Sequence, residues 1–301
     1  MTWRLSVEHV TTYEYAGDAL ASYNEARLTP SRDRQLVLDH RVQVVPRVPM
    51  MRYVDYWGSE VCSFDVSEPH QRLVVTGRSL VETAPSRAVP LRGEFGPGGS
   101  GWERLRAEDV RDQFYEFLTP SAFVVCDDPR VAAAARELTE IESPAEVVEA
   151  VSNWSRDQLL YEAGATDVST TSSEALDGGR GVCQDFVHVA IALLRACGIP
   201  ARYASGYLHP QEDATIGDSV TGQSHAWLEA WLGEWYPVDP TSGTEVGERH
   251  VLVARGRDYG DVAPLKGVFH GPPDLSVDVR VAIERSRSVR PRPTRSIAAE
   301  G

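Results

Sequence analysis

The sequence predicts an α+β protein in which an N-terminal antiparallel β-sandwich-like domain precedes a domain of helices and strands. Apolar and polar residues alternate in short runs from Thr2 to about Thr83, which is the period of half-buried strands. A glycine-rich stretch, LRGEFGPGGSGW, covers residues 91–102. After it the apolar residues follow a helical period, and one long apolar helix is followed by a run of strands.

The N-terminal runs are bounded by turn residues, which favours strands joined by short connections. Five of them illustrate the pattern: WRLSVEHV, LVLDHRVQVV, MRYVDYW, VCSFDV and LVVTG. We therefore assign residues 1–85 to an N-terminal β domain and residues 86–105 to a linker.

Three helices are predicted after the linker, at residues 106–118, 127–140 and 143–161. The third begins with Ser143, which lies three residues before Glu146 and directly before Pro144. Ser at the N-cap, Glu at the third helical position and Pro at the first are typical helix-start signals.

The remaining elements complete the second domain, which we assign to residues 106–284. The helix that follows Gly178 is succeeded by predicted strands at 201–208, 224–232, 235–241 and 275–284. The last segment, 285–301, is rich in Arg and Pro, and we predict a disordered tail there.

Composition excludes several classes of function. The chain has 301 residues and a formal charge of −14, which argues against binding to nucleic acids or to anionic membranes. Neither a signal peptide nor a membrane-spanning segment is recognisable, so we expect a cytoplasmic protein. Its four cysteines lack the spacing of a zinc site and suggest no disulfide framework. The oligomeric state is left open.

Cys183 is the first candidate for chemistry. It follows the run GGRG and precedes an apolar segment without Gly or Pro up to Gly198, so it falls in the first turn of a helix. Unpaired N–H groups and the helix dipole favour a negative charge there, and hence a thiolate. A buried cysteine without these features is more often a small core residue.

A cysteine nucleophile needs a histidine and a group that orients it. The strand SHAWLEAWL supplies His225 and the segment WYPVDPT supplies Asp239. A two-residue turn between these strands would put the two side chains on opposite faces. A three-residue turn makes Trp231 face Trp235 and brings Asp239 to the face of His225, and we predict this register.

The motifs GVCQDF, HAWLEAWL and WYPVDPT together resemble the core of the transglutaminase-like superfamily, over roughly Ser143 to Pro264. The segment YNEARLTP resembles part of the N-terminal region of bacterial transglutaminase-like proteins. The resemblance implies a papain-like core with a Cys183, His225 and Asp239 triad.

What the resemblance implies chemically is attack on an amide carbonyl of a peptide or protein, a thioester, and its capture by water or by an amine as second substrate. We favour water, because transamidation needs a cleft that excludes water and admits an amine. The alternatives are a protein-glutamine transamidase, a deamidase and a non-catalytic peptide-binding module. No cofactor is expected. A metal site built from the three triad residues is the chemical rival, but no second Cys and no HExxH motif supports it.

Two further sets of residues are weaker candidates. The oxyanion would be bound by the backbone N–H of the nucleophile and by a side chain, for which Tyr161 is the first candidate and Gln158 and Trp154 are alternatives. Trp227 and Gln184 are candidates for the wall of the substrate cleft.

Overall fold

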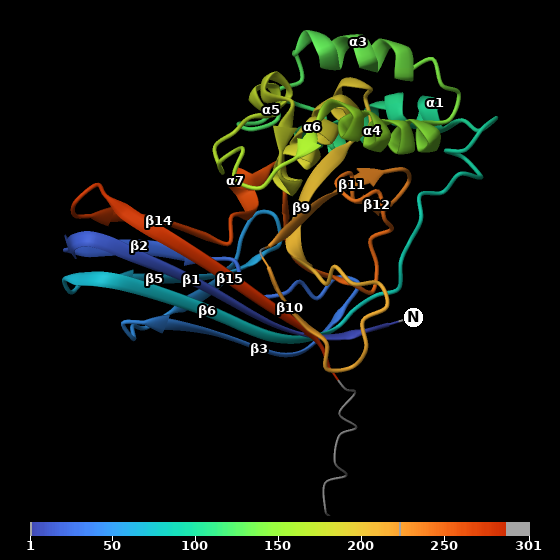
Figure 1. Cartoon of the computed structure of the whole chain (residues 1–301). Helices are drawn as coiled ribbons and strands as arrows, with labels where there is room; N and C mark the ends of the chain where they lie inside the picture. Colours follow the sequence, from blue (N-terminus) through green and yellow to red (C-terminus); the bar gives the residue numbers. More distant parts are fainter. Residues whose placement is uncertain (1, 223, 287–301) are drawn as a thin grey trace, which may run out of the picture.

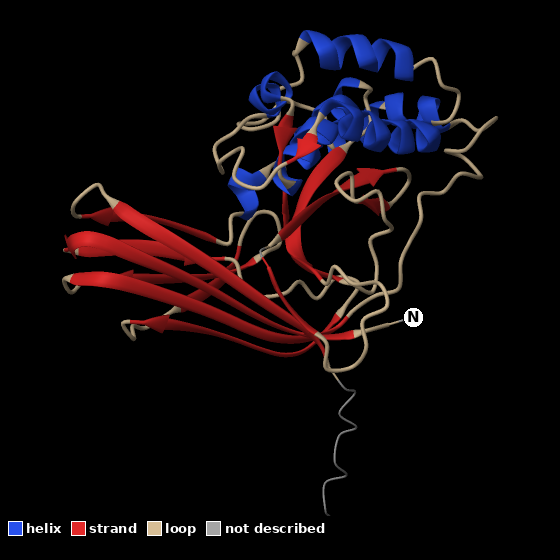
Figure 2. Ribbon diagram, viewed as in Figure 1, coloured by secondary structure: helices blue, strands red, loops and turns tan. Residues whose placement is uncertain are grey.

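The computed structural model describes residues 2–222 and 224–286. Helices gather at one end of the molecule, and the long strands of a β-sandwich extend away from them (Figure 1). A smaller sheet that contains β9 and β11 lies between the two parts, and Figure 2 shows how clearly helices and strands separate. The fold is therefore the mixed α+β arrangement that the sequence predicts.

The β-sandwich consists of two sheets around a core of its own, which includes Leu28, Phe64 and Leu73. In order, the first sheet contains β10 (Ser219–Gly222), β15 (Leu275–Arg285), β1 (Arg4–Ala19), β6 (His70–Glu82) and β3 (Leu36–Val45). The second contains β14 (Leu265–His270), β2 (Ala21–Ala26), β5 (Glu60–Val66) and β4 (Met51–Val54).

Three strands from the second half of the sequence belong to this sandwich. β15 pairs along its whole length with β1, β10 pairs with β15, and β14 pairs with β2. The domain that we assigned to residues 106–284 thus gives strands to the sheets of the N-terminal domain. Of the predicted disordered tail, residues 287–301 lie outside the described residues.

The first helix begins inside the predicted linker, and the other helices pack around the buried helix α6. Ser143 caps α4 as predicted: its Oγ accepts a hydrogen bond from the N–H of Glu146 at 3.2 Å, and Pro144 is the first helical residue. The helices are α1 (Gly101–Arg106), α2 (Glu108–Gln113), η1 (Tyr115–Phe117), α3 (Pro129–Leu138), α4 (Pro144–Gln158), α5 (Ser172–Gly178), α6 (Cys183–Ala196) and α7 (Tyr259–Val262).

The sheet between the two parts carries one side of the candidate site, and α6 packs on it against β9 and β11. Its order is β12 (Trp235–Val238), β11 (His225–Trp231), β9 (Ala201–Leu208) and β13 (His250–Gly256). A parallel pair, β7 (Leu160–Tyr161) and β8 (Arg180–Gly181), lies beside the start of α6.

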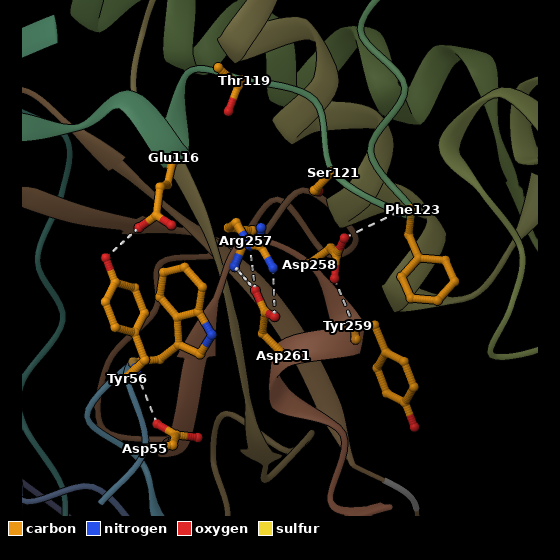
Figure 3. A network of polar contacts seen from close by, with 12 residues as sticks. Asp55, Tyr56, Glu116, Thr119, Ser121, Phe123, Arg257, Asp258, Tyr259 and Asp261 are labelled. Atoms are coloured by element: carbon orange, nitrogen blue, oxygen red, sulfur yellow. Dashed lines mark hydrogen bonds and ion pairs between the residues drawn. The ribbon is translucent and has the colours of Figure 1, made fainter. Parts of the chain in front are cut away.

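Polar contacts join the sandwich to the helical part (Figure 3). The hydroxyl of Tyr56 donates to Glu116 at 2.9 Å, and the guanidinium of Arg257 lies 5.2 Å from the centre of a Trp57 ring.

Within the described residues, no helix has the length and apolar character needed to cross a bilayer.

Candidate active site

Cys183 is the first residue of α6, and the local structure explains why. The carboxylate of Asp185 accepts hydrogen bonds from the N–H of Val182 at 2.7 Å and from the hydroxyl of Thr166 at 2.6 Å. A side chain at Gly181 would clash, because an added Cβ would lie 2.6 Å from the Cβ of Asp185. The chain before the cysteine is therefore held in place, with a partly exposed thiol at the helix N-terminus.

His225 and Asp239 meet across the hairpin of β11 and β12. Trp231 pairs with Trp235, so three residues form the turn and the predicted register is confirmed. The Nε2 atom of His225 lies 2.9 Å from Oδ2 of Asp239. Cys183 and His225 line the same cavity, and Cys183 is one of the groups that raise the pKa of this histidine.

The carboxylate of Asp239 is buried and held from several sides. Its Oδ1 atom accepts from the N–H groups of Thr241 and Ser242, at 2.9 and 3.3 Å, and its Oδ2 atom accepts from the hydroxyl of Ser242 at 2.7 Å. Burial alone would raise the pKa of Asp239, but the hydrogen bonds from His225 and Ser242, together with the nearby imidazole of His250, lower it well below its usual range. The carboxylate is therefore ionised at neutral pH.

The electrostatics of His225 favour its charged form. Burial opposes protonation of the imidazole, but the hydrogen bonds and negative charges of Asp239 and Cys183 outweigh it and raise the pKa of His225 to about 10. The site can therefore hold an ionised carboxylate on Asp239 beside a protonated imidazole on His225.

A cavity of about 470 Å³ opens beside Cys183 and His225. Its walls come from both parts of the molecule, because Val220, Thr221 and Gly222 of β10 and Ile283 of β15 line it opposite the helical part. The five-stranded sheet of the sandwich, to which β10 and β15 belong, is therefore one wall of the candidate site.

The weaker candidates fall into two groups. Tyr161 and Gln184 line the cavity, and burial together with the nearby Cys183 raises the pKa of Tyr161, which keeps its hydroxyl protonated. Gln158 is exposed at the end of α4, and Trp154 packs half-buried against the core. Trp227 is buried, with its ring centre 6.4 Å from that of His225.

His250, the first residue of β13, is a neighbour of the site that the sequence interpretation missed. It is buried, its Nε2 atom lies 4.0 Å from Oδ2 of Asp239, and its ring centre lies 6.0 Å from that of His225. No local motif marks it, because it reaches Asp239 through the pairing of β13 with β9.

Three of these residues could also hold a metal ion. The ligand atoms of His225, Asp239 and His250 lie within 4.8 Å of one another. Such a metal would compete for the lone pairs that now bind His225 and Ser242, so metal binding and the hydrogen-bonded triad exclude each other at this carboxylate.

Comparison with known families matches both parts of the chain. A family model described as the transglutaminase-like superfamily matches residues 132–240, which include Cys183, His225 and Asp239. A second model, the bacterial transglutaminase-like N-terminal region, matches residues 5–82.

Individual relatives cover the whole chain or its core. The uncharacterized protein ML0607 of Mycobacterium leprae is 44% identical over 284 residues, covering 94% of this chain and 99% of that protein. The protein-glutamine gamma-glutamyltransferase of Pseudomonas aeruginosa is 29% identical over 171 residues, covering 52% of this chain and 25% of the enzyme. The crystal structure of a candidate cysteine protease of Cytophaga hutchinsonii superposes with a TM-score of 0.70 at 22% identity, covering 93% of this chain and 90% of that one.

Proposed function

Because the chain belongs to the transglutaminase-like superfamily, with the bacterial transglutaminase-like N-terminal region, we propose that it hydrolyses amide bonds through a thioester on Cys183. The observation that carries the proposal is the 2.9 Å bond between His225 and Asp239, on an imidazole that lines the same cavity as Cys183. A nucleophile, a proton carrier and an orienting carboxylate are the parts that acyl transfer requires.

In the first step the thiolate of Cys183 attacks the carbonyl carbon of the amide. An S–C bond forms, and the carbonyl electron pair moves to the oxygen. When the oxyanion collapses, the C–N bond breaks and the imidazolium of His225 gives its proton to the leaving nitrogen. The products of this step are an amine and an acyl-thioester enzyme.

In the second step the neutral imidazole of His225 takes a proton from water, and the resulting hydroxide attacks the thioester carbonyl. The C–S bond then breaks, which releases the carboxylic acid and restores the thiolate and imidazolium. Asp239 keeps its charge throughout and holds the ring, in agreement with its lowered pKa.

The oxyanion needs hydrogen-bond donors near the nucleophile, and two groups are suited to this role. The backbone N–H of Cys183 belongs to the first turn of α6, where N–H groups lack intrahelical acceptors. Tyr161 lines the same cavity and keeps its hydroxyl proton. We propose both as oxyanion donors.

Transfer of the acyl group to an amine is the second candidate. It is favoured by the likeness of the core to a relative named protein-glutamine gamma-glutamyltransferase. In that reaction an amine replaces water in the second step, and each triad residue keeps the role that it has in hydrolysis. Deamidation of a glutamine side chain differs from peptide cleavage only in the amine that leaves.

The pH dependence of iodoacetamide labelling at Cys183 tests the proposal in the parent and in His225→Ala, with the modified peptide quantified by mass spectrometry. We expect fast labelling well below the free-thiol pKa of about 8.5 in the parent, and slow labelling in the variant. Labelling at the rate of an ordinary thiol in both proteins would overturn the proposal and favour a non-catalytic binding module.

Product analysis then separates water from amine as the acceptor. Dimethylated casein is incubated with the parent protein, with and without a fluorescent primary amine, and Cys183→Ala is the control. New N-termini or released ammonia that do not depend on the amine indicate hydrolysis. Incorporation of the fluorescent amine into casein indicates transamidation.

A further inference from the structure

A larger cavity, of about 800 Å³, adjoins the catalytic cavity. Val168, Ser224 and Tyr259 line both, so the two cavities are direct neighbours. The larger cavity lies where the sandwich meets the helical part, and β1, β14 and β15 supply much of its wall. A ligand that extends from Cys183 can therefore pass over the N-terminal sheet.

The floor of the larger cavity is one face of the five-stranded sheet. Tyr13 pairs with Val277 and Thr11 pairs with Val279, and directly paired residues of antiparallel strands share a face. The same face of β15 continues through Val281, which is fully buried, to Ile283, which lines the catalytic cavity. The seven residues from Val277 to Ile283 span about 20 Å in a strand, the length of a similar number of extended peptide residues.

The face of β15 that lines the cavity is apolar. Val277 is 50% exposed and Val279 is 36% exposed, which is unusual for neighbouring valines on one face. Lys266 brings a charged amino group to the lining, where it donates to the carbonyl of Gly260, whereas the side chain of Asp278 lies on the opposite face of β15 and pairs with Arg280 at 2.8 Å. His9, also in the lining, is neutral at physiological pH because burial lowers its pKa to about 4. In a chain with a charge of −14, such a surface suits an uncharged ligand.

The opposite wall is held in a fixed position by hydrogen bonds. The carboxylate of Asp258 accepts from the N–H groups of Phe123, at 3.1 Å, and of Gly260, at 2.8 Å. The N–H of Tyr259 bonds Nε2 of His188 at 3.2 Å. Figure 3 shows the rings of Phe123 and Tyr259 on the same side of Asp258. A wall that is fixed before binding lowers the entropy that the protein loses when a ligand binds.

From this arrangement we propose that the cavity between the two parts binds an extended, uncharged and apolar polypeptide segment of about six residues, next to the amide that Cys183 attacks. The proposal rests on the proposed function and specifies its substrate. The apolar side chains that alternate along the segment would contact Tyr13, Val277 and Val279. The N-terminal domain would then be part of the substrate site.

Affinity labelling tests this without turnover. Cys183 is alkylated by iodoacetamide or by an iodoacetyl-capped apolar hexapeptide, in which the sulfur displaces iodide from carbon. We expect the peptide to react at least about tenfold faster than iodoacetamide at low concentration, since two or more apolar side chains become buried. In the double variant Val277→Arg, Val279→Arg this ratio should fall to about one, while the iodoacetamide rate stays the same.

Val268→Arg is the matched control, because this valine of the neighbouring strand β14 is 69% exposed and lies outside the cavity lining. A peptide ratio near one in the parent, or a ratio unchanged in the double variant, would overturn the proposal. So would faster labelling by a glutamate-rich hexapeptide, or a dimer in sedimentation experiments that dissociates in the double variant. Failure of the proposed function would appear separately, as slow iodoacetamide labelling of the parent, because the peptide ratio does not depend on thiol activation.

Discussion

The Nε2 atom of His250 lies 4.0 Å from Oδ2 of Asp239, the oxygen that also binds His225. The Nδ1 atom of His250 accepts a hydrogen bond from the N–H of Gly247 at 3.2 Å, so in the neutral ring the proton resides on Nε2. Burial lowers the pKa of His250 and keeps it neutral. Its N–H therefore points a positive dipole at the carboxylate, and we propose His250 as a positioning residue for the triad.

Replacement of His250 tests this role. We expect His250→Leu to lower kcat about 3- to 10-fold with little change in KM, because Asp239 loses one favourable N–H dipole. His250→Gln keeps an N–H donor at a similar distance and should recover most of the activity. Steady-state kinetics on a peptide substrate, with thermal melts of both variants, provide the measurement. Equal losses of kcat in both variants would point to a purely structural role.

The raised pKa of His225 predicts a pH-dependent stability. The folded protein keeps a proton on His225 up to a pH of about 10, whereas the unfolded chain releases it near its usual value of 6.5. The stabilisation is therefore complete below pH 6.5 and is lost as the pH rises towards 10. We expect the free energy of unfolding of the parent to fall more steeply in this range than that of His225→Asn, by up to about 1.4 kcal/mol per pH unit.

Urea unfolding at several pH values between 6 and 10 measures the two slopes. In Cys183→Ala the imidazole loses one of the groups that raise its pKa, so the stabilisation should disappear at a lower pH than in the parent. Parallel curves for the parent and His225→Asn would show that this histidine titrates with the same pKa in both states.

A buried ion cluster predicts a large effect on stability away from the cysteine. Glu229 of β11 is buried and accepts hydrogen bonds from Arg202 of β9 and Arg255 of β13, both at 2.7 Å. Glu229→Ala leaves two buried guanidinium groups without this partner and should lower the free energy of unfolding by about 3–5 kcal/mol. Glu8→Ala, which removes an exposed pair with Arg78, should cost less than about 1 kcal/mol. Denaturant unfolding of both variants tests the contrast, and similar losses would contradict it.

Local signals in the sequence were enough to predict the elements that hold the triad. The position of Cys183 at the start of α6 follows from glycine and apolar patterning, and the N-cap at Ser143 follows from hydroxyl chemistry. The hairpin register follows from the two-residue period of strands and the requirement that His225 and Asp239 share a face.

Features that depend on pairing between distant strands could not be predicted. The sandwich strands β14 and β15 follow the helical part in sequence, and nothing local to them specifies β2 and β1 as partners. The position of His250 could not be predicted either, because its neighbour in space, Asp239, belongs to a separate connection between strands. Trp227 was expected in the wall of the cleft, but it is buried and its ring contacts those of His225 and His250.

The turn between β11 and β12 provides the sharpest test of how the sequence sets the site. Deletion of Gly233 shortens the three-residue turn to two, and a one-residue slip moves every later side chain to the other face. Asp239 would then point away from His225, and we expect the fast labelling of Cys183 at low pH to be lost. Gly233→Asn is the control, since Asn tolerates the positive φ of 81° at this position and keeps the turn length. Retained labelling in a folded deletion variant would show that the pairing of Trp231 with Trp235 does not determine the position of the carboxylate.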